Sequence, residues 1–245
     1  MNKPLAAIIL AAGKGTRMNS NLPKVLHEVA GEPMIVHVIH TAINLGAEKI
    51  IAVIGYKHEI VKKALENEPV ECTLQLKQLG TAHAVLQCQN LLANFKGNVL
   101  ILYGDVPLTK VETLDRLMKV HNNEGACSTI LTTDLPDPTG YGRIIRNPDD
   151  SLMKIVEEKD ATDKERKVVE INSGIYVFDA KTLFRLLPSV GNNNRQNEYY
   201  LPDVLNLIIL EKGKVAIDKI NNYIEIQGVN NTEQLTKVNE LYENV

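Results

Sequence analysis

The sequence predicts an α/β fold, in which a mixed, mainly parallel sheet is flanked by helices. In the first half of the 245 residues, apolar runs of strand length alternate with segments of helical periodicity, the pattern of βαβ units. The second half carries shorter β-rich pieces between polar loops. No repeat and no linker divides the chain. We therefore expect one domain over residues 1–245, Rossmann-like, with a smaller β-rich lobe.

The strands of the first half are predicted from apolar runs, and its helices from helical spacing and from the residues that typically start and end a helix. Between the apolar runs, "PMIVHVIHTAINLG" shows apolar residues at helix spacing, with Pro33 in the first turn and Gly46 at the end. "GTAHAVLQCQNLLANF" and "KVETLDRLMKVHN" are two more helix candidates. The sequence predicts strands at 5–10, 49–54, 70–76 and 98–103, and helices within 33–46, 80–95 and 110–122.

After residue 125 the sequence pattern changes to short β-rich segments separated by "DLPDPTGYG", "NPDD" and "KDATDKERK". Because these pieces are too short to form a sheet of their own with a full core, we expect them beside the first sheet. The sequence predicts strands at 127–133, 143–146, 152–157 and 169–178, and closing helices near 201–212 and 232–243.

Composition excludes several classes of protein. The chain has 27 basic and 30 acidic residues and a net charge of -3, so we expect no nucleic acid partner. Its three cysteines are widely spaced without C-x-x-C, which argues against a disulfide framework or a zinc site and favours a reducing, cytoplasmic setting. No run approaches the roughly 20 apolar residues of a membrane span, so no membrane partner is expected. Lys3 and the apolar run after it imitate a short signal peptide, but Pro4 and the charged loop that follows disfavour this.

The loop after the first predicted strand is rich in glycine and positive charge. Residues 13–24 contain Lys14, Arg17 and Lys24 and no acidic residue. A glycine loop between a strand and a helix favours phosphate binding, because backbone N–H groups attract anions there. The G-x-x-x-x-G-K-[ST] motif is absent, and Met18 replaces the third glycine of G-x-G-x-x-G, which disfavours a dinucleotide-dependent dehydrogenase. Composition alone leaves open a turn whose charges are merely solvated.

Two further stretches follow predicted strands. In "LYGDVPL", Asp105 stands just past a strand, at the edge where open α/β sheets bind ligands. A carboxylate beside a triphosphate would hold Mg²⁺, although a simple Gly-Asp turn is the alternative. In "LQLKQLGTAHAV", the amides of Gln75 and Gln78 can pair with a pyrimidine edge and Gly80 permits close approach, although an ordinary helix start explains them too.

The full pattern L-A-A-G-x-G-T-R-M, followed by Pro23 and Lys24, resembles the signature of the sugar nucleotidyltransferases, the nucleotide-diphospho-sugar pyrophosphorylases. The segments "QLGTAHA", "YGDVP", "PTGYGRI", "EINSGI", "NEYY" and "GVNN" resemble, in order and over nearly the whole chain, one branch of that family. This branch is the uridyltransferase domain of bacterial bifunctional N-acetylglucosamine-1-phosphate uridyltransferases/glucosamine-1-phosphate acetyltransferases. The resemblance implies the nucleotide-diphospho-sugar transferase fold and a cytoplasmic enzyme that supplies precursors of peptidoglycan and lipopolysaccharide.

The resemblance also implies a reaction and a role for each matching position. UMP would pass from UTP to N-acetylglucosamine 1-phosphate with Mg²⁺ as cofactor, giving UDP-N-acetylglucosamine and pyrophosphate. The family's roles fall as follows: catalytic, Arg17 and Lys24; nucleotide-binding, Leu10, Ala11, Ala12, Gly13, Gln75, Gly80 and Thr81; sugar-binding, Tyr103, Gly104, Gly142, Glu157, Asn172 and Tyr200; metal-binding, Asp105 and Asn230.

Three departures from the family qualify the resemblance. Pro202 stands where relatives commonly have threonine, and Gln227 where they commonly have glutamate, so we expect altered sugar affinity with activity retained. No hexapeptide period of a C-terminal acetyltransferase β-helix is present in residues 1–245, so the sequence is either the first domain of a longer protein or a monofunctional protein. Because trimer formation in the bifunctional relatives rests largely on that domain, we expect a monomer or weak homo-oligomer. The alternatives are a nucleotidyltransferase for another sugar or base, and a non-catalytic sensor of nucleotide sugars. Intact Arg17, Lys24, Asp105 and Asn230 disfavour the sensor.

Overall fold

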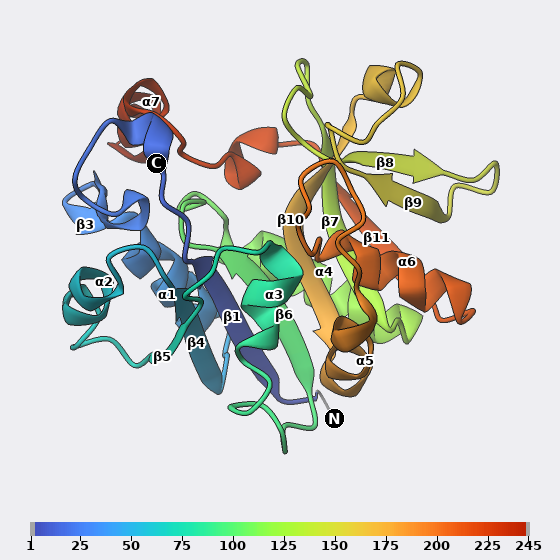
Figure 1. The fold of residues 1–245 in the computed structure, drawn as a ribbon, viewed down its shortest axis with the longest axis horizontal. Coiled ribbons are helices and arrows are strands. Elements are labelled where there is room, and N and C mark those ends of the chain that lie inside the picture. The colour runs from blue at the N-terminus through green and yellow to red at the C-terminus, as the bar shows by residue number, and fades with distance from the viewer. Residues whose placement is uncertain (1–2, 244–245) are drawn as a thin grey trace.

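A twisted nine-stranded sheet forms the centre of the protein in the computed structural model, which describes residues 3–243 (Figure 1). The main path of the sheet runs β11-β7-β10-β6-β1-β4-β5, and β8 and β9 branch from β10. Its strands are β1 (Leu5–Ala11), β4 (Lys49–Ile54), β5 (Glu71–Leu74), β6 (Asn98–Tyr103), β7 (Ser128–Asp134), β8 (Arg143–Arg146), β9 (Leu152–Val156), β10 (Glu170–Asp179) and β11 (Val215–Ile220). A separate two-stranded hairpin joins β2 (Glu28–Val29) and β3 (Glu32–Pro33).

The first half forms the predicted parallel frame. All seven residues of β1 are buried, and β1 pairs in parallel with both β4 and β6. Such a strand is covered on both faces, which explains its unbroken apolar run. Its side chains alternate between two cores: Ala6, Ile8 and Leu10 lie in one, and Leu5, Ala7 and Ile9 in the other.

Helices cover both faces of the sheet (Figure 1). The core that holds Ile8 is closed by α3 (Thr81–Leu86), α5 (Ala180–Leu186) and α6 (Pro202–Leu210). The core that holds Ile9 is closed by α1 (Met34–Asn44), α2 (His58–Ala64) and α4 (Val111–Glu124). The last helix, α7 (Thr232–Glu243), packs against β2, and its Val238 shares a core cluster with Met18 of the glycine loop, so the end of the described chain returns to the glycine-loop side.

The strands of the second half extend the same sheet, as the sequence predicts. β10 lies antiparallel between β6 and β7, and β11 adds to β7 in parallel. Near Gly174, with φ +83°, the pairing of β10 with β7 shifts register. Beyond this irregularity β10 also pairs with β8, and the β8–β9 hairpin leaves the plane of the sheet as the smaller lobe (Figure 1). That the chain is one uridyltransferase domain stays a prediction.

The predicted helix over 80–95 is wrong in its length, because α3 ends at Leu86. The Gln87 side-chain amide donates to the His83 carbonyl at 2.9 Å and takes the acceptor that the next helical N–H would use. The Gln87 N–H bonds instead to Ala84, three residues back, and short turns follow.

Two expectations about composition can be compared with the structure. Cys72, Cys88 and Cys127 are all free thiols, as the prediction of no disulfide framework requires. Within residues 3–243, no helix is both long enough and apolar enough to cross a bilayer.

Candidate active site

A cavity of about 380 Å³ lies beyond the carboxyl ends of β1 and β6, where ligands of open α/β sheets bind. It collects all of the residues that the sequence assigns to the nucleotide and the metal, together with the predicted catalytic Lys24, whereas Arg17 is not among its lining residues. Its lining includes Leu10, Ala11, Ala12, Gly13, Lys24, Gln75, Gly80, Thr81, Tyr103, Asp105 and Asn230. These residues come from five separate stretches of the chain, and folding brings them to one edge of the sheet.

The two predicted catalytic cations meet the two predicted metal ligands. Lys24 Nζ donates to Asp105 Oδ2 and, at 3.1 Å, to Asn230 Oδ1. Arg17 donates from Nη2 to the same Asn230 oxygen at 3.0 Å. The side chains of Lys24 and Asp105 are only 16% and 13% exposed, so their ion pair is stronger than one in open solvent. This edge of the sheet therefore already holds two cations around one carboxylate and one amide.

The glycine loop positions Lys24 through a close backbone approach. Gly15 has φ +60°, and a Cβ at this position would lie 2.5 Å from the Cβ of Lys24. A side chain there would push Lys24 away, so the loop needs glycine at residue 15. Pro23 then fixes the entry into the short 3₁₀ turn Lys24–Leu26, whose Val25 and Leu26 are buried and anchor the lysine backbone.

A backbone hydrogen bond joins the loop after β6 to the loop before α7. The Val229 N–H donates to the Asp105 carbonyl at 2.9 Å, which sets the neighbouring Asn230 beside the Asp105 carboxylate. The Asn230 N–H in turn donates to the Gln234 side chain at 2.7 Å, in the first turn of α7. Asn230 is therefore held from both sides although it lies in a loop.

The cavity floor near α3 depends on Gly80 and Thr81. Gly80 has φ +112°, and a Cβ there would lie 2.5 Å from the Tyr199 carbonyl oxygen. The Thr81 hydroxyl accepts a hydrogen bond from the Leu201 N–H at 2.9 Å, and the Ala82 N–H donates to the Tyr199 carbonyl at 2.9 Å. The start of α3 is thus fixed to the segment before α6.

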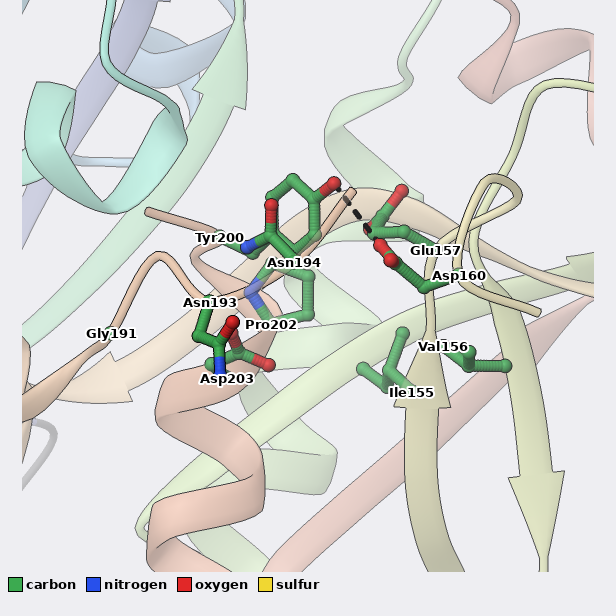
Figure 2. A pocket seen from close by; sticks show the side chains of 10 residues that line it. All are labelled: Ile155, Val156, Glu157, Asp160, Gly191, Asn193, Asn194, Tyr200, Pro202 and Asp203. Carbon is green, nitrogen blue, oxygen red and sulfur yellow. Dashed lines mark hydrogen bonds between the residues drawn. The ribbon is translucent and has the colours of Figure 1, made fainter. Parts of the chain in front are cut away.

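Glu157 and Tyr200, two predicted sugar-binding residues, line a second cavity of about 360 Å³ (Figure 2). Figure 2 shows the Tyr200 ring above Pro202, with the Tyr200 hydroxyl donating to Asp160 at 3.2 Å. Pro202 is the first residue of α6, a position that proline favours because its missing N–H would be unpaired there. The remaining lining comes from the end of β9 and the 191–194 loop, together with Asp160 and Asp203.

Carboxylates crowd Glu157. Burial, followed by the negative charges of Asp203, Asp160 and Glu198, raises its pKa to about 7, and Arg143 opposes this only in part. Near neutral pH a sizeable fraction of Glu157 is therefore protonated and can donate a hydrogen bond as well as accept one. A group of this kind suits a neutral polar ligand with hydroxyl or amide groups.

The other predicted sugar-binding residues lie around Glu157 and between the two cavities. A Cβ at Gly142 would lie 3.0 Å from Glu157 Oε1, and Asn172 Oδ1 accepts from the Tyr176 hydroxyl at 2.8 Å. Tyr103 lines the first cavity, and burial together with the charges of Glu157 and Asp105 raises its pKa. The Tyr103 phenol therefore stays protonated and can donate a hydrogen bond.

Gly104 differs from the other predicted sugar-binding positions. A Cβ there would point at Val25, Ala11 and Ile35, in the core beneath the glycine loop, and its N–H donates to the Leu10 carbonyl at 3.0 Å. Gly104 therefore supports the loop that carries the first cavity, and its predicted sugar contact stays a prediction.

Sequence reasoning missed the acidic neighbours of Glu157, namely Asp160, Glu198 and Asp203. They lie up to 46 residues from it along the chain, and only "EEKD" signals local acid clustering. Between residues 3 and 243 no group of three or more His, Cys, Asp and Glu side chains is arranged to hold a metal ion.

The fold and the site define a nucleotidyltransferase, and comparison with known proteins agrees. The family model "Nucleotidyl transferase" matches residues 6–223, and the chain belongs to this family. It is 52% identical over 237 residues to "Bifunctional protein GlmU" of Alkaliphilus metalliredigens, covering 97% of this chain and 52% of that protein. It is 47% identical over 234 residues to the protein of the same name from Bacillus subtilis, covering 96% and 51%. The chain spans about half the length of the curated relatives it matches.

Two solved structures share the fold. A putative glucose-1-phosphate thymidylyltransferase from Bacillus anthracis has a TM-score of 0.76 at 21% identity, over 98% of this chain and 96% of that one. A UDP-glucose pyrophosphorylase complexed with UDP-glucose has a TM-score of 0.76 at 18% identity, over 100% and 99%. These matches confirm the predicted architecture, a mixed, mainly parallel sheet flanked by helices.

Proposed function

We propose that this chain transfers UMP from UTP to N-acetylglucosamine 1-phosphate, releasing pyrophosphate and forming UDP-N-acetylglucosamine. The observation that carries the proposal is that Lys24 and Arg17 contact Asp105 and Asn230, and that three of these residues, Lys24, Asp105 and Asn230, line the first cavity. The similarity to the GlmU proteins over 96–97% of this chain supports the choice of substrates. The product would serve synthesis of peptidoglycan and other cell-envelope polymers.

The proposed reaction needs no general base. A sugar phosphate has a second pKa near 6, by analogy with phosphorylated side chains, so its oxygen is already anionic at neutral pH. That oxygen attacks the α-phosphorus of UTP, a new P–O bond forms, and the bond to the β-phosphate breaks with its electrons on pyrophosphate. Catalysis therefore rests on alignment and charge neutralisation. In our proposal Lys24 holds the sugar phosphate and the α-phosphate, and Arg17 holds the leaving pyrophosphate.

The donor set at Asp105 and Asn230 fits a hard cation. Both oxygens lie within hydrogen-bonding reach of one ammonium nitrogen, that of Lys24, so they converge on a point that a positive charge can occupy. Carboxylate and amide oxygens together with phosphate oxygens are the ligands that Mg²⁺ prefers. When bound, Mg²⁺ would neutralise charge that develops on the phosphates. We therefore assign Mg²⁺ to Asp105 and Asn230.

The second cavity is proposed to hold the sugar. Glu157, with its raised pKa, and Tyr200 supply a donor and acceptors for hydroxyl and amide groups, and Gly142 leaves room beside Glu157. Pro202 lines this cavity, so its replacement of a family threonine removes a hydroxyl from the sugar's surroundings. We expect weaker selection among sugar 1-phosphates without loss of the reaction.

The first experiment is pyrophosphate release from UTP, with and without N-acetylglucosamine 1-phosphate, in Mg²⁺ and then in excess chelator. Release that requires both the sugar phosphate and the metal supports the proposal. Release only with glucose 1-phosphate or another nucleotide would overturn the substrate assignment and keep the mechanism. If every pair is silent while UDP-N-acetylglucosamine still binds, the protein is a sensor.

Variants test the assigned roles. Loss of one charge-stabilising contact typically costs about 10²- to 10³-fold in rate, so Lys24→Met and Arg17→Met are each expected to lose that much turnover. Lys57→Met is the matched control, because the half-buried Lys57 lies near the loop, where its ammonium donates to the Asn21 carbonyl and lies over the Tyr56 ring. Turnover of Lys24→Met equal to that of Lys57→Met would contradict the role of Lys24.

A further inference from the structure

We propose that His83 is a positioning residue that fixes the Gln75 amide with its oxygen toward the nucleotide cavity, and thereby selects uracil over cytosine. The inference rests on the proposed function and names a determinant of its base specificity. It depends on hydrogen bonds at the start of α3, beside the cavity that Gln75 and Gly80 line.

The orientation of the Gln75 amide follows from its neighbours. Gln75 is only 4% exposed, and one atom of its amide lies 3.0 Å from the Gly80 carbonyl oxygen and 3.0 Å from His83 Nδ1. A backbone carbonyl can only accept, so the amide atom that faces it must be nitrogen. The same NH₂ group then donates its second hydrogen to His83 Nδ1. Both hydrogens of the Gln75 amide are used inside the protein.

His83 must accept at Nδ1 for this arrangement to hold. A neutral imidazole with its hydrogen on Nε2 offers a lone pair at Nδ1, whereas an imidazolium offers none. The Gln87 amide nitrogen, which donates to the His83 carbonyl, lies 3.3 Å from His83 Nε2. A neutral ring accepts at one nitrogen only, and the shorter contact, 3.0 Å from Gln75 to Nδ1, assigns that role to Nδ1. Burial lowers the pKa of His83 and so favours the neutral ring. The backbone on either side is also fixed, since Tyr199 accepts from the Ala82 N–H and its N–H donates to the Leu79 carbonyl. His83 therefore stabilises one orientation of the Gln75 amide, the one with its nitrogen toward the Gly80 carbonyl and its oxygen toward the cavity.

With its NH₂ group held by the protein, the Gln75 amide has only its oxygen, Oε1, left for a ligand. Gln75 Oε1 accepts no hydrogen bond from any described residue, and it is not among the fully enclosed polar atoms that lack a partner. It therefore keeps its lone pairs exposed on the side of the cavity. An acceptor with no rotational freedom requires a donor from the ligand. Uracil offers an imide N–H at position 3, whereas cytosine has a lone pair at the same position.

The cost of presenting cytosine follows from this mismatch. Two facing acceptors leave both groups unpaired in a partly enclosed site, which corresponds to a roughly tenfold to hundredfold preference for uracil. A Gln75 amide free to turn over would present its NH₂ to cytosine and lose most of that preference. The ratio of uridine to cytidine nucleotide affinities thus measures how firmly His83 holds Gln75.

The experiment is equilibrium binding of UMP and of CMP by isothermal titration calorimetry, which needs no turnover. For the unaltered protein we expect UMP to bind roughly ten to a hundred times more tightly than CMP. His83→Leu removes the acceptor and is expected to bring the ratio close to that of Gln75→Met. His83→Gln, whose side-chain oxygen can accept, is expected to restore most of the ratio. His40→Leu, on the far side of the sheet in α1, is the matched control and should keep it.

The outcomes separate the inference from the proposed function and from a structural role. If neither nucleotide binds to the unaltered protein, the proposed function fails. If UMP binds and His83→Leu weakens UMP and CMP equally, His83 only supports the fold and the inference is overturned. Turnover gives a second readout: His83→Leu should raise the KM for UTP and leave kcat at saturating UTP close to normal. A loss confined to kcat would also overturn the inference.

Discussion

Glu157 makes the stability of this protein depend on pH in a predictable direction. Its folded-state pKa is about 7, against an ordinary value of 4.5, because its half-buried site removes it from water and places it near the negative charges of Asp203, Asp160 and Glu198. Between these two pH values the folded state binds more protons than the unfolded state, so the free energy of unfolding falls as pH rises. The loss is complete above pH 7. At 1.36 kcal/mol per pH unit, a rise from 4.5 to about 7 corresponds to about 3 kcal/mol.

The substitution that isolates this effect is Glu157→Gln, which keeps the shape and removes the titration. Unfolding in urea followed by circular dichroism, at pH values from 4 to 8, gives the free energy of each variant. The stability of Glu157→Gln relative to the unaltered protein should increase by about 3 kcal/mol between pH 4 and pH 8. Glu66→Gln, an exposed carboxylate after α2, should show no such trend. A difference for Glu157→Gln that stays constant with pH would refute the reasoning.

Three other predictions concern backbone space, buried charge and the metal. Gly80→Ala should destabilise the fold by about 2 kcal/mol, measured by thermal unfolding, because its φ of +112° and the Tyr199 backbone leave no room for a Cβ. Arg143→Met should cost about 3 kcal/mol in urea unfolding, because Arg143 is 2% exposed and Glu158, 2.6 Å away, would lose the nearer of its two cations and keep only Arg166 at 3.7 Å. Asp105→Asn should weaken Mn²⁺ binding in the presence of UTP, measured by water-proton relaxation, by roughly tenfold or more.

The parallel part of the sheet was predictable because its strands have a clear sequence pattern. β1, β4 and β6 are continuous apolar runs, and glycine or proline marks the helices between them. The sequence could not show that β10 runs antiparallel between β6 and β7, since nine of its ten residues are buried and a fully buried run has no directional pattern. It also missed α2 and α5, whose seven residues each are too few for a clear helical period.

For the site, the local motifs were informative and the long-range electrostatics were not. Residues around the glycine loop and Asp105 lie in short stretches with distinct composition, and the structure brings them to one cavity. The raised pKa of Glu157 depends on Asp203 and Glu198, which lie 46 and 41 residues further along the chain. No spacing rule connects such residues, because only the folded sheet places them together. The orientation of the Gln75 amide likewise depends on a hydrogen bond to the Gly80 backbone carbonyl. Every residue has such a carbonyl, so the sequence does not indicate which one Gln75 contacts.

The hydrogen bond from Val229 to the Asp105 carbonyl has a consequence for how the protein acquires function during synthesis. The glycine loop is synthesised first. Asn230, which contacts both Arg17 and Lys24, follows 213 residues after Arg17 and 206 residues after Lys24. Contacts of such long sequence separation close late in folding. A nascent chain that has made β1, β4 and β6 therefore presents a basic loop with no amide oxygen to order it. If the proposed roles of Arg17, Lys24 and Asn230 hold, a chain that stops before residue 230 is expected to be inactive, because it lacks the amide oxygen that both cations contact.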